Sequence, residues 1–376
     1  MKRIKFFNYI LMAIFLQTLL SACNSGSNNA SNQGTPLGIN TATKMLNNVT
    51  EFSKPQYLIQ MEIQNNLQDG VLNLHEIDQA TGDISQVVYS AYLNSYKPLG
   101  YNNDNKQLYL YQPIGTPYLY NYKVCSINSA FDRFSALSCD QYYLDLSYYF
   151  SYLGNNSDGN LSIKFLPGGD YAYIAGGLKT NNFSVIKCAV DKQNGSLYSC
   201  QQLLTKSLAK DSIISGFDVA FPNDEPTLYY SISSNQSSSL TSGVTSCPLV
   251  SGFGMLSGAC VQTLINNMGA GPIVVDSVEG NIYAANNSQQ LVRYQLNKLS
   301  GAVISGGIIV DTPAYGYTLT GLAINQYPTN SKLYTIYTNN DGSNIVKQCS
   351  TFGGFGCYYA SNYKFSAQEL FVNYTP

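Results

Sequence analysis

The sequence predicts an all-β fold, a β-propeller of six four-stranded blades, from two features that repeat along the chain. First, a strand-turn-strand phrase with a glycine in its turn returns about every 55 residues, a period typical of propeller blades. Second, tyrosine-rich strands precede the copies of that phrase, and Gly, Pro, Asn and Asp mark the turns between short apolar runs. Beyond the N-terminal leader, no segment has a convincing helical period.

The recurring phrase is clearest in VIKCAVDKQNGSLYSC, residues 185–200. Its copies share an Asp or Asn shortly before a glycine; the matched pairs are Asp78 with Gly82, Asp191 with Gly195, and Asn297 with Gly301. A side chain that caps a tight turn explains the Asp and Asn without any function. We therefore expect the phrase to be the outer hairpin of a blade.

The second half of each repeat is a strand rich in tyrosine, and the chain has 32 tyrosines and no tryptophan. Tyrosine is favoured in strands that have one buried face and one solvent-exposed face. These strands are 108–112, 171–177, 228–233, 281–287 and 332–340. Each follows a shorter apolar run and a turn, so one repeat supplies four strands.

Six units follow from this pattern, approximately 56–90, 97–145, 159–205, 213–264, 271–310 and 318–363. The first unit lacks an inner strand, and the C-terminal segment QELFVNYTP is expected to supply it and so close the ring. A seventh blade, hidden in residues 140–158, is the alternative count, although this segment is short for a blade.

Nine cysteines are present, and all but Cys23 fall into pairs of sequence neighbours. The pairs are Cys125 with Cys139, Cys188 with Cys200, Cys247 with Cys260, and Cys349 with Cys357. Opposed residues of an antiparallel hairpin lie within disulfide range, so we expect four hairpin disulfides in an oxidising compartment. Zinc is the competing interpretation, but its close C-x-x-C doublets are absent. Units one and five place His75 and Val87, and Tyr294 and Gly306, where the others have cysteines.

The N-terminus carries Lys2, Arg3 and Lys5, then an apolar run that is short for a membrane span. It ends in Leu20-Ser21-Ala22-Cys23, which resembles the lipobox of bacterial lipoprotein precursors. The resemblance implies a signal peptide over 1–22, acylation of Cys23, a flexible tether over 23–50 and a propeller over 51–376. It further implies a cell-envelope location, the outer membrane rather than the inner, because Asn24 replaces the aspartate that favours inner-membrane retention. A plain secretory signal is the alternative.

Removal of the leader leaves 17 basic against 22 acidic residues, with no basic block. Electrostatic binding of nucleic acid is therefore not expected. The repeat at 281–303 resembles the YVTN-type repeat of lactonase-like bacterial β-propellers, and the cysteine-clasped version resembles Gram-negative envelope lipoproteins. Some relatives of this fold are lactonases or cyclising enzymes, but no catalytic motif of theirs matches a position in this sequence.

Polar residues near the ends of inner strands are the candidate residues for a site at the mouth of a central channel. They are Asp218, Asp276 and Asn325, and we favour for each the plainer explanation of strand-end or turn polarity. His75, the only histidine, is expected to be structural filler, and no catalytic residue, metal or cofactor is assigned.

Two function classes remain. We favour a non-enzymatic, monomeric lipoprotein that binds a protein or glycan partner through a propeller face rich in Tyr and Asn. The alternative is a lactonase-type hydrolase or isomerase that uses acidic residues at the channel mouth. A glycan-binding adhesin, with tyrosines exposed in a row, is a third hypothesis.

Overall fold

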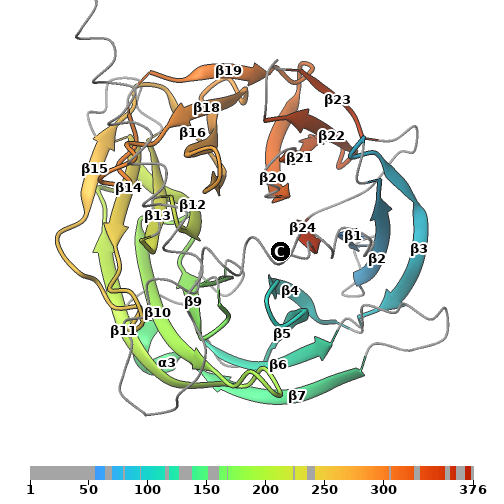
Figure 1. Cartoon of the computed structure of the whole chain (residues 1–376), viewed down its shortest axis with the longest axis vertical. Helices are drawn as coiled ribbons and strands as arrows, with labels where there is room; N and C mark the ends of the chain where they lie inside the picture. The colour runs from blue at the N-terminus through green and yellow to red at the C-terminus, as the bar shows by residue number, and fades with distance from the viewer. Residues whose placement is uncertain are drawn as a thin grey trace, which may run out of the picture. The chain divides into compact units, whose positions relative to one another are not determined.

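The computed structural model shows six four-stranded antiparallel sheets that follow one another around a ring (Figure 1). It describes residues 56–63, 70–78, 81–93, 95–114, 118–126, 138–150, 161–166, 168–222, 225–234, 242–304, 306–325, 331–351, 356–360 and 369–373. The predicted six-bladed β-propeller is confirmed. The expected signal peptide, Cys23 and the tether lie outside the described residues.

Each blade contains four strands, here ordered from the inner to the outer strand. Blade 1 is β24 (Glu369–Asn373), β1 (Gln56–Ile63), β2 (Gly70–Ile77) and β3 (Ile84–Tyr92). Blade 2 is β4 (Lys97–Asn102), β5 (Gln107–Pro113), β6 (Leu119–Ser126) and β7 (Ser138–Asp145). Blade 3 is β8 (Ser162–Phe165), β9 (Tyr171–Gly176), β10 (Asn182–Val190) and β11 (Leu197–Ser207).

Blades 4 to 6 repeat this order. Blade 4 is β12 (Ser212–Ala220), β13 (Thr227–Ser234), β14 (Gly243–Pro248) and β15 (Val261–Leu264). Blade 5 is β16 (Met268–Asp276), β17 (Asn281–Asn286), β18 (Leu291–Gln295) and β19 (Ile308–Asp311). Blade 6 is β20 (Tyr317–Asn325), β21 (Lys332–Asn339), β22 (Asn344–Ser350) and β23 (Cys357–Tyr359).

The ring closes where β24, from the C-terminus, pairs with β1, from the N-terminal end of the propeller. The register matches Tyr57 with Asn373 and Met61 with Glu369. Blade 1 is therefore built from both ends of the domain, as the unit without an inner strand predicted. Closure removes two sheet edges that would otherwise be unpaired.

One short helix, α3 (Ser147–Phe150), follows blade 2. Phe150 is buried in the core between blades 2 and 3, and the Tyr149 hydroxyl donates to the carbonyl of Cys200 at 2.6 Å. This helix occupies part of the segment 140–158 in which a seventh blade was the alternative. Within the described part of the chain, no helix is long and apolar enough to span a bilayer.

All four predicted disulfides join the third and fourth strands of one blade. The four clasps lie in blades 2, 3, 4 and 6, and their Cα atoms are 4.0 to 4.2 Å apart. Cys125 faces Cys139 directly, and Cys349 faces Cys357. The pairing within blades is therefore confirmed, and we call these four disulfides the clasps.

Blades 1 and 5 have no clasp. In blade 1, His75 faces Val87 in the backbone register, as predicted, and its ring Nδ1 lies 3.0 Å from the carbonyl of Ser85. In blade 5, the Tyr294 ring lies over Gly307, where an added Cβ would come within 2.5 Å of it. The predicted partner Gly306 is one residue off, because the strand β19 begins after a short irregular segment.

The recurring glycine has a role that the sequence pattern did not reveal. Tyrosine hydroxyls from the second strand of one blade donate to the glycine carbonyl in the outer hairpin of the next blade. These interblade latches are Tyr109 to Gly195 (2.8 Å), Tyr173 to Gly254 (2.9 Å), Tyr229 to Gly301 (2.7 Å) and Tyr334 to Gly82 (2.9 Å). Burial raises the pKa of all four hydroxyls far above the usual range, so each remains a proton donor.

Positive φ explains why these positions are glycine: φ is +65° at Gly301 and +75° at Gly195, a region that side chains disfavour. The preceding Asp or Asn caps the turn, as expected, because the Asp191 carboxylate accepts from the Gln193 amide at 2.8 Å. Hydrophobic clusters between neighbouring blades complete the core; one of them packs Ala175 and Val185 of blade 3 against Ile214 and Val219 of blade 4. The latches join blades 2 to 3, 3 to 4, 4 to 5 and 6 to 1, and the hydrophobic clusters pack neighbouring blades together.

Because the strands alternate in direction, the propeller has two faces. The turns between first and second strands and between third and fourth strands lie at one end, here the hairpin face, which includes 191–196, 276–280 and 297–302. The turns between second and third strands, and the connections from one blade to the next, lie at the other end, here the link face. The link face includes 287–290, 312–316 and 340–343.

Candidate functional site

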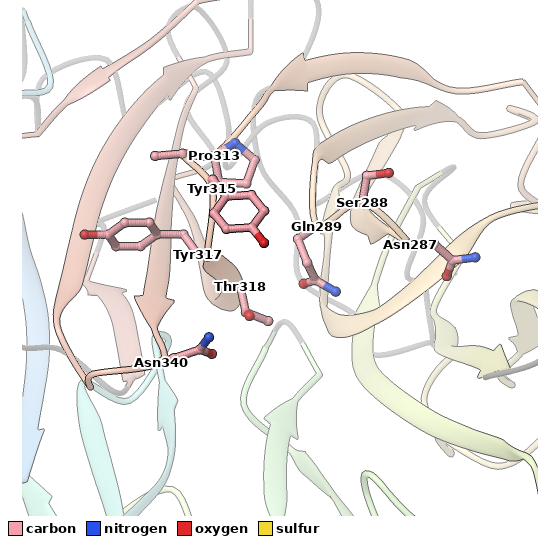
Figure 2. A pocket seen from close by; sticks show the side chains of 10 residues that line it. Asn287, Ser288, Gln289, Pro313, Tyr315, Tyr317, Thr318 and Asn340 are labelled. Carbon is pink, nitrogen blue, oxygen red and sulfur yellow. The ribbon is translucent and has the colours of Figure 1, made fainter.

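Three loops of the link face line an open pocket of about 570 Å³ between blades 5 and 6 (Figure 2). The residues that line it are Asn287, Ser288, Gln289, Pro313, Ala314, Tyr315, Gly316, Tyr317, Thr318 and Asn340. Its volume falls in the range of about 300 to 1,000 Å³ that small-molecule sites occupy.

The first loop is the turn between β17 and β18, and the side chain of Asn286 fixes it. The Asn286 Oδ1 accepts from the amides of Ser288 and Gln290, both at 2.9 Å, and its Nδ2 donates to the Gln290 side chain at 2.7 Å. Gln289 has a positive φ of 60°, and its Oε1 accepts from the Leu319 amide of blade 6 at 3.3 Å. Since the oxygen is engaged, the Gln289 amide presents its NH₂ group as a donor.

The second loop connects β19 to β20 and carries Tyr315. The Tyr317 amide donates to the Ala314 carbonyl at 3.2 Å, which closes a turn with Tyr315 and Gly316 at its centre. Gly316 has a φ of +87°, as the third residue of a type II turn requires. This turn holds the Tyr315 ring in solvent, where it is fully exposed. In Figure 2 its hydroxyl is directed towards the side of the pocket formed by Gln289 and Thr318.

The ends of this connection are tied to both blades. The Gln290 side chain donates to the Thr312 hydroxyl at 3.0 Å. Beside it, the Lys347 ammonium of blade 6 lies 3.0 and 2.8 Å from the two carboxylate oxygens of Asp311. Both side chains are about nine-tenths buried, and the ammonium also lies 5.3 Å from the centre of the Tyr337 ring. This ion pair joins β19 of blade 5 to β22 of blade 6.

The third loop is the turn between β21 and β22. The Asn340 amide donates to the Asn339 side chain at 2.7 Å, and the Ser343 amide donates to the Asp341 carboxylate at 2.8 Å. All three loops are thus held by hydrogen bonds before any ligand arrives, which lowers the entropic cost of binding.

The lining of the pocket is aromatic and polar, and it includes no Asp, Glu, Lys, Arg or His. Asn and Gln amides and Ser and Thr hydroxyls can each donate or accept hydrogen bonds. An exposed tyrosine adds a flat apolar surface with a polar tip. Such a lining can recognise a neutral, hydroxyl-bearing ligand, but it holds no charged group for acid–base chemistry or for neutralising an ion.

The sequence-predicted candidates lie elsewhere. Asp218, on the inner strand β12, accepts from the Val275 amide of blade 5 at 2.8 Å. Its other carboxylate oxygen lies 3.4 Å from the Lys164 ammonium of blade 3. Asp218 therefore links three blades, and its carboxylate is engaged in structure.

Asp276 and Asn325 occupy matching positions at the ends of β16 and β20, on the hairpin face. Asp276 is fully buried, and its Oδ1 accepts from the amides of Val278 and Glu279 at 3.1 Å. Burial raises the pKa of its carboxyl to about 6. Asn325 is also buried. The structure places both residues on inner strands, as expected, but at the opposite end of the propeller from the pocket.

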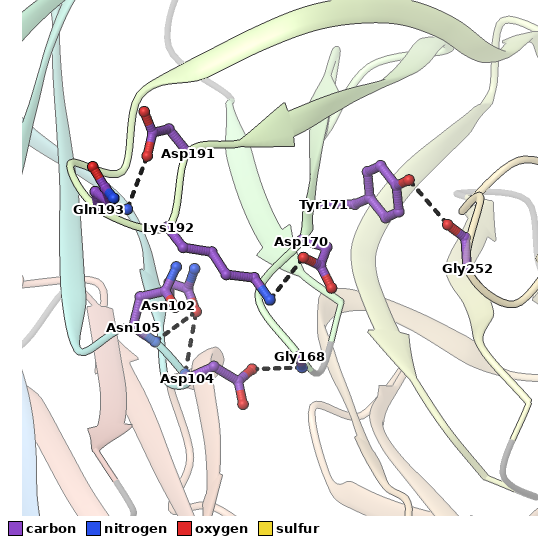
Figure 3. Close-up of polar contacts among 10 residues, drawn as sticks. All are labelled: Asn102, Asp104, Asn105, Gly168, Asp170, Tyr171, Asp191, Lys192, Gln193 and Gly252. Atoms are coloured by element: carbon purple, nitrogen blue, oxygen red, sulfur yellow. Dashed lines mark hydrogen bonds and ion pairs between the residues drawn. The ribbon is translucent and has the colours of Figure 1, made fainter. Parts of the chain in front are cut away.

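A second group of polar residues lies on the hairpin face over blades 2 to 4 (Figure 3). The Asp104 carboxylate accepts from the Gly168 amide at 2.9 Å, and the Lys192 ammonium lies 2.7 Å from Asp170. Burial raises the pKa of the Asp104 carboxyl. Lys192 and Asp170 are both more than half exposed, so this ion pair stabilises the fold little. The Asp104–Gly168 contact joins turns of blades 2 and 3, whereas the Lys192–Asp170 ion pair joins two turns within blade 3.

Metal chemistry finds no support in the part of the chain that the structure describes, where no group of three His, Cys, Asp or Glu side chains converges. His75 lies in the hairpin of blade 1 at the place of a clasp cysteine, fully buried, and burial lowers its pKa. Its position matches the structural role that the sequence suggested.

Sequence reasoning missed the pocket residues Gln289, Tyr315 and Asn340. The signal that could have found them is the segment Pro313-Ala314-Tyr315-Gly316-Tyr317, in which a tyrosine and a glycine occupy a turn between blades. Tyrosines in strands are mostly buried in this fold, whereas a tyrosine in a tight turn must point into solvent.

Comparison with known proteins supports the fold alone. No protein-family model matches the chain, and no curated protein matches it. Two solved structures of provisionally assigned 6-phosphogluconolactonases are similar. The one from Bacteroides uniformis has a TM-score of 0.52 and 12% identity, over 85% of this chain and 99% of its own. The one from Bacteroides fragilis has a TM-score of 0.50 and 11% identity, over 86% and 99%.

The periplasmic gluconolactonase of Pseudomonas aeruginosa reaches a TM-score of 0.49 at 12% identity, over 81% of this chain and 82% of its own. At such identities the likeness concerns the arrangement of strands and not the residues of a site. The chain is a six-bladed β-propeller, similar in fold to the two Bacteroides structures.

Proposed function

We propose that this protein is a cell-envelope lipoprotein that binds a partner through the link-face pocket between blades 5 and 6, without chemically converting it. The observation that carries the proposal is the lining of that pocket, which is preorganised, aromatic and free of charged side chains. Binding sites use such groups for orientation and contact, whereas hydrolysis of a lactone needs an acid, a base or a metal.

The acidic residues that an enzyme would use support the same proposal. Asp218 is engaged by a backbone amide and a lysine, and Asp276 is closed off from solvent. The raised pKa of Asp276 is the one feature typical of a catalytic carboxyl, yet a side chain with no exposed surface cannot contact a substrate.

The envelope location rests on the lipobox-like sequence that ends at Cys23 and on the four clasps, since disulfides persist in oxidising compartments. Acylation of Cys23 would tether the propeller to the outer membrane through residues 23–50. In cells treated with globomycin, which blocks lipoprotein processing, we expect the unprocessed precursor to accumulate. Unaltered processing, or a mature N-terminus without acyl chains in mass spectrometry, would remove the lipoprotein part of the proposal.

The binding activity is tested by capture from envelope extract with the lipidated, full-length protein. Tyr315→Ala is expected to abolish capture of the partner that the wild type retains. Tyr148→Ala is the matched control, because Tyr148 is also highly exposed but lies on α3, away from the pocket. Equal capture by all three proteins would contradict a role for the pocket. Turnover of glucono-δ-lactone by the wild type that Asp276→Asn abolishes would instead establish the lactonase-type alternative.

A further inference from the structure

We propose that the ligand recognised in the link-face pocket is a neutral pyranose sugar, a free residue or the exposed end of an envelope glycan, stacked on the ring of Tyr315. This inference rests on the proposed function and names the ligand class of that site. It follows from three properties of the pocket: its aromatic surface, its hydrogen-bonding groups and its lack of charge.

The aromatic surface is the exposed ring of Tyr315. Aromatic rings carry negative charge on their faces, so they attract the polarised C–H groups that line one side of a pyranose ring. A tyrosine side chain that is fully exposed to water normally contributes little to the stability of the fold. Here a turn with Gly316 at positive φ holds the ring above the pocket, so a ligand would find its stacking surface already in place.

The hydrogen-bonding groups come from the turns that hold Gln289 and Asn340 and from Thr318 in β20. The NH₂ group of Gln289 is directed by the bond of its oxygen to the Leu319 amide. The Asn340 and Thr318 side chains belong to blade 6, and in the view of Figure 2 Thr318 lies between Gln289 and Asn340. Sugar hydroxyls both donate and accept, as these amide and hydroxyl groups do, so each ligand hydroxyl can be satisfied in either sense.

The absence of charge among the lining residues excludes other ligand classes. A uronic acid or a phosphorylated sugar would lose water from its anionic group with no cation to replace it, which costs free energy. A quaternary ammonium ligand requires aromatic rings that converge on one point. Figure 2 shows the rings of Tyr315 and Tyr317 extending to different sides, so they form no such cage.

The test is titration calorimetry of the full-length protein with glucose, galactose, mannose, N-acetylglucosamine, glucuronic acid and choline. We expect at least one neutral sugar to bind and glucuronic acid and choline to fail. Tyr315→Ala should weaken that binding by roughly three- to tenfold, the loss expected for one aromatic contact. Gln289→Ala should weaken it by a similar factor, whereas Tyr148→Ala should leave it unchanged. The same sugar should compete for partner capture from envelope extract.

The outcomes separate the two proposals. Capture that depends on Tyr315 but resists every neutral sugar would overturn the ligand class and leave the binding function intact. Binding of choline or glucuronic acid in place of neutral sugars would also overturn it. Tyr315-independent capture and Tyr315-independent sugar binding would overturn both, and circular dichroism of each variant distinguishes these results from misfolding.

Discussion

Blades 2, 3, 4 and 6 fasten their outer hairpin with a disulfide, whereas blades 1 and 5 hold the same hairpin without one. In a clasped blade, such as blade 4, Cys247 is fully buried and links the outer strand covalently to its neighbour. In blade 5, the Tyr294 ring fills the same place against Gly307. In blade 1, His75 fills it and bonds to Ser85.

The same position in the outer hairpin is therefore filled in every blade, but by different groups: a disulfide in four blades, a tyrosine in blade 5 and a histidine in blade 1. The outermost strand of a blade has one neighbour only, so its hairpin must be fixed by a covalent link or by a large buried side chain. The interblade latch is present in both kinds of hairpin. Tyr173 donates a hydrogen bond to the clasped hairpin of blade 4, and Tyr229 donates one to the unclasped hairpin of blade 5.

The largest expected effect concerns blade 1, which has no clasp and depends on ring closure. Deletion of residues 369–376 removes β24, so β1 loses its inner partner and its inner edge is left unpaired. We expect the purified protein to lose its cooperative thermal transition in circular dichroism. A transition within a few degrees of the wild type would show that closure contributes little to stability.

Removal of one clasp is expected to have the next largest effect on stability. Cys247→Ala with Cys260→Ala opens a link across 13 positions, which lowers the free energy of unfolding by about 3 kcal/mol in the chain-entropy model. Urea unfolding measures the loss. Hydrogen exchange should accelerate in β15 and stay unchanged in β19 of the unclasped blade 5, and a uniform acceleration would contradict a local role.

The reverse change should convert blade 1 into a clasped blade. His75→Cys with Val87→Cys places cysteines at directly opposed backbone positions, as in blades 2 and 6. We expect a fifth disulfide in non-reduced peptide mass spectrometry and a gain of about 2 kcal/mol in urea unfolding. Free thiols at both positions would show that the hairpin of blade 1 differs in geometry from the others.

The last comparison is between blade 5 and blade 6, which carry Asp276 and Asn325 at the same position. The folded-state pKa of Asp276, about 6, exceeds its ordinary value of 3.8, so its contribution to stability is full below pH 3.8 and is lost as pH rises through 6. Asp276→Asn should therefore raise the free energy of unfolding at pH 7.5 by at most about 3 kcal/mol and not at pH 3.5. An Asp276→Asn variant with the same stability as the wild type at every pH would show that the ionised carboxylate is tolerated in this turn.

Much of this architecture could be predicted because it depends on local sequence patterns. Strand-turn periodicity gave the six units, and pairing between sequence neighbours gave the clasps, since a hairpin brings Cys188 and Cys200 together whatever the rest of the fold does. The missing inner strand of blade 1 pointed to β24. The recurrence of Gly82, Gly195 and Gly301 was visible too, but its reason lay in tyrosines of other blades.

The site could not be predicted in the same way, because the pocket exists only where two blades meet. Gln289 and Asn340 lie far apart in sequence, and their approach depends on the angle between blades 5 and 6. The residues favoured by sequence, Asp218 and Asp276, have the chemistry of a site, but the Asp218 carboxylate is engaged by other blades and Asp276 is buried, with its Oδ1 bonded to backbone amides and its Oδ2 without a partner. Residue type alone cannot reveal which carboxylates are already engaged.

The most direct test of sugar binding at the link-face pocket is hydrogen–deuterium exchange of the full-length protein with and without the neutral sugar found to bind. We expect slower exchange in the three link-face loops at 286–290, 312–318 and 339–343, and unchanged exchange at 276–280 on the hairpin face. Protection centred on 276–280, with the link-face loops unchanged, would contradict it.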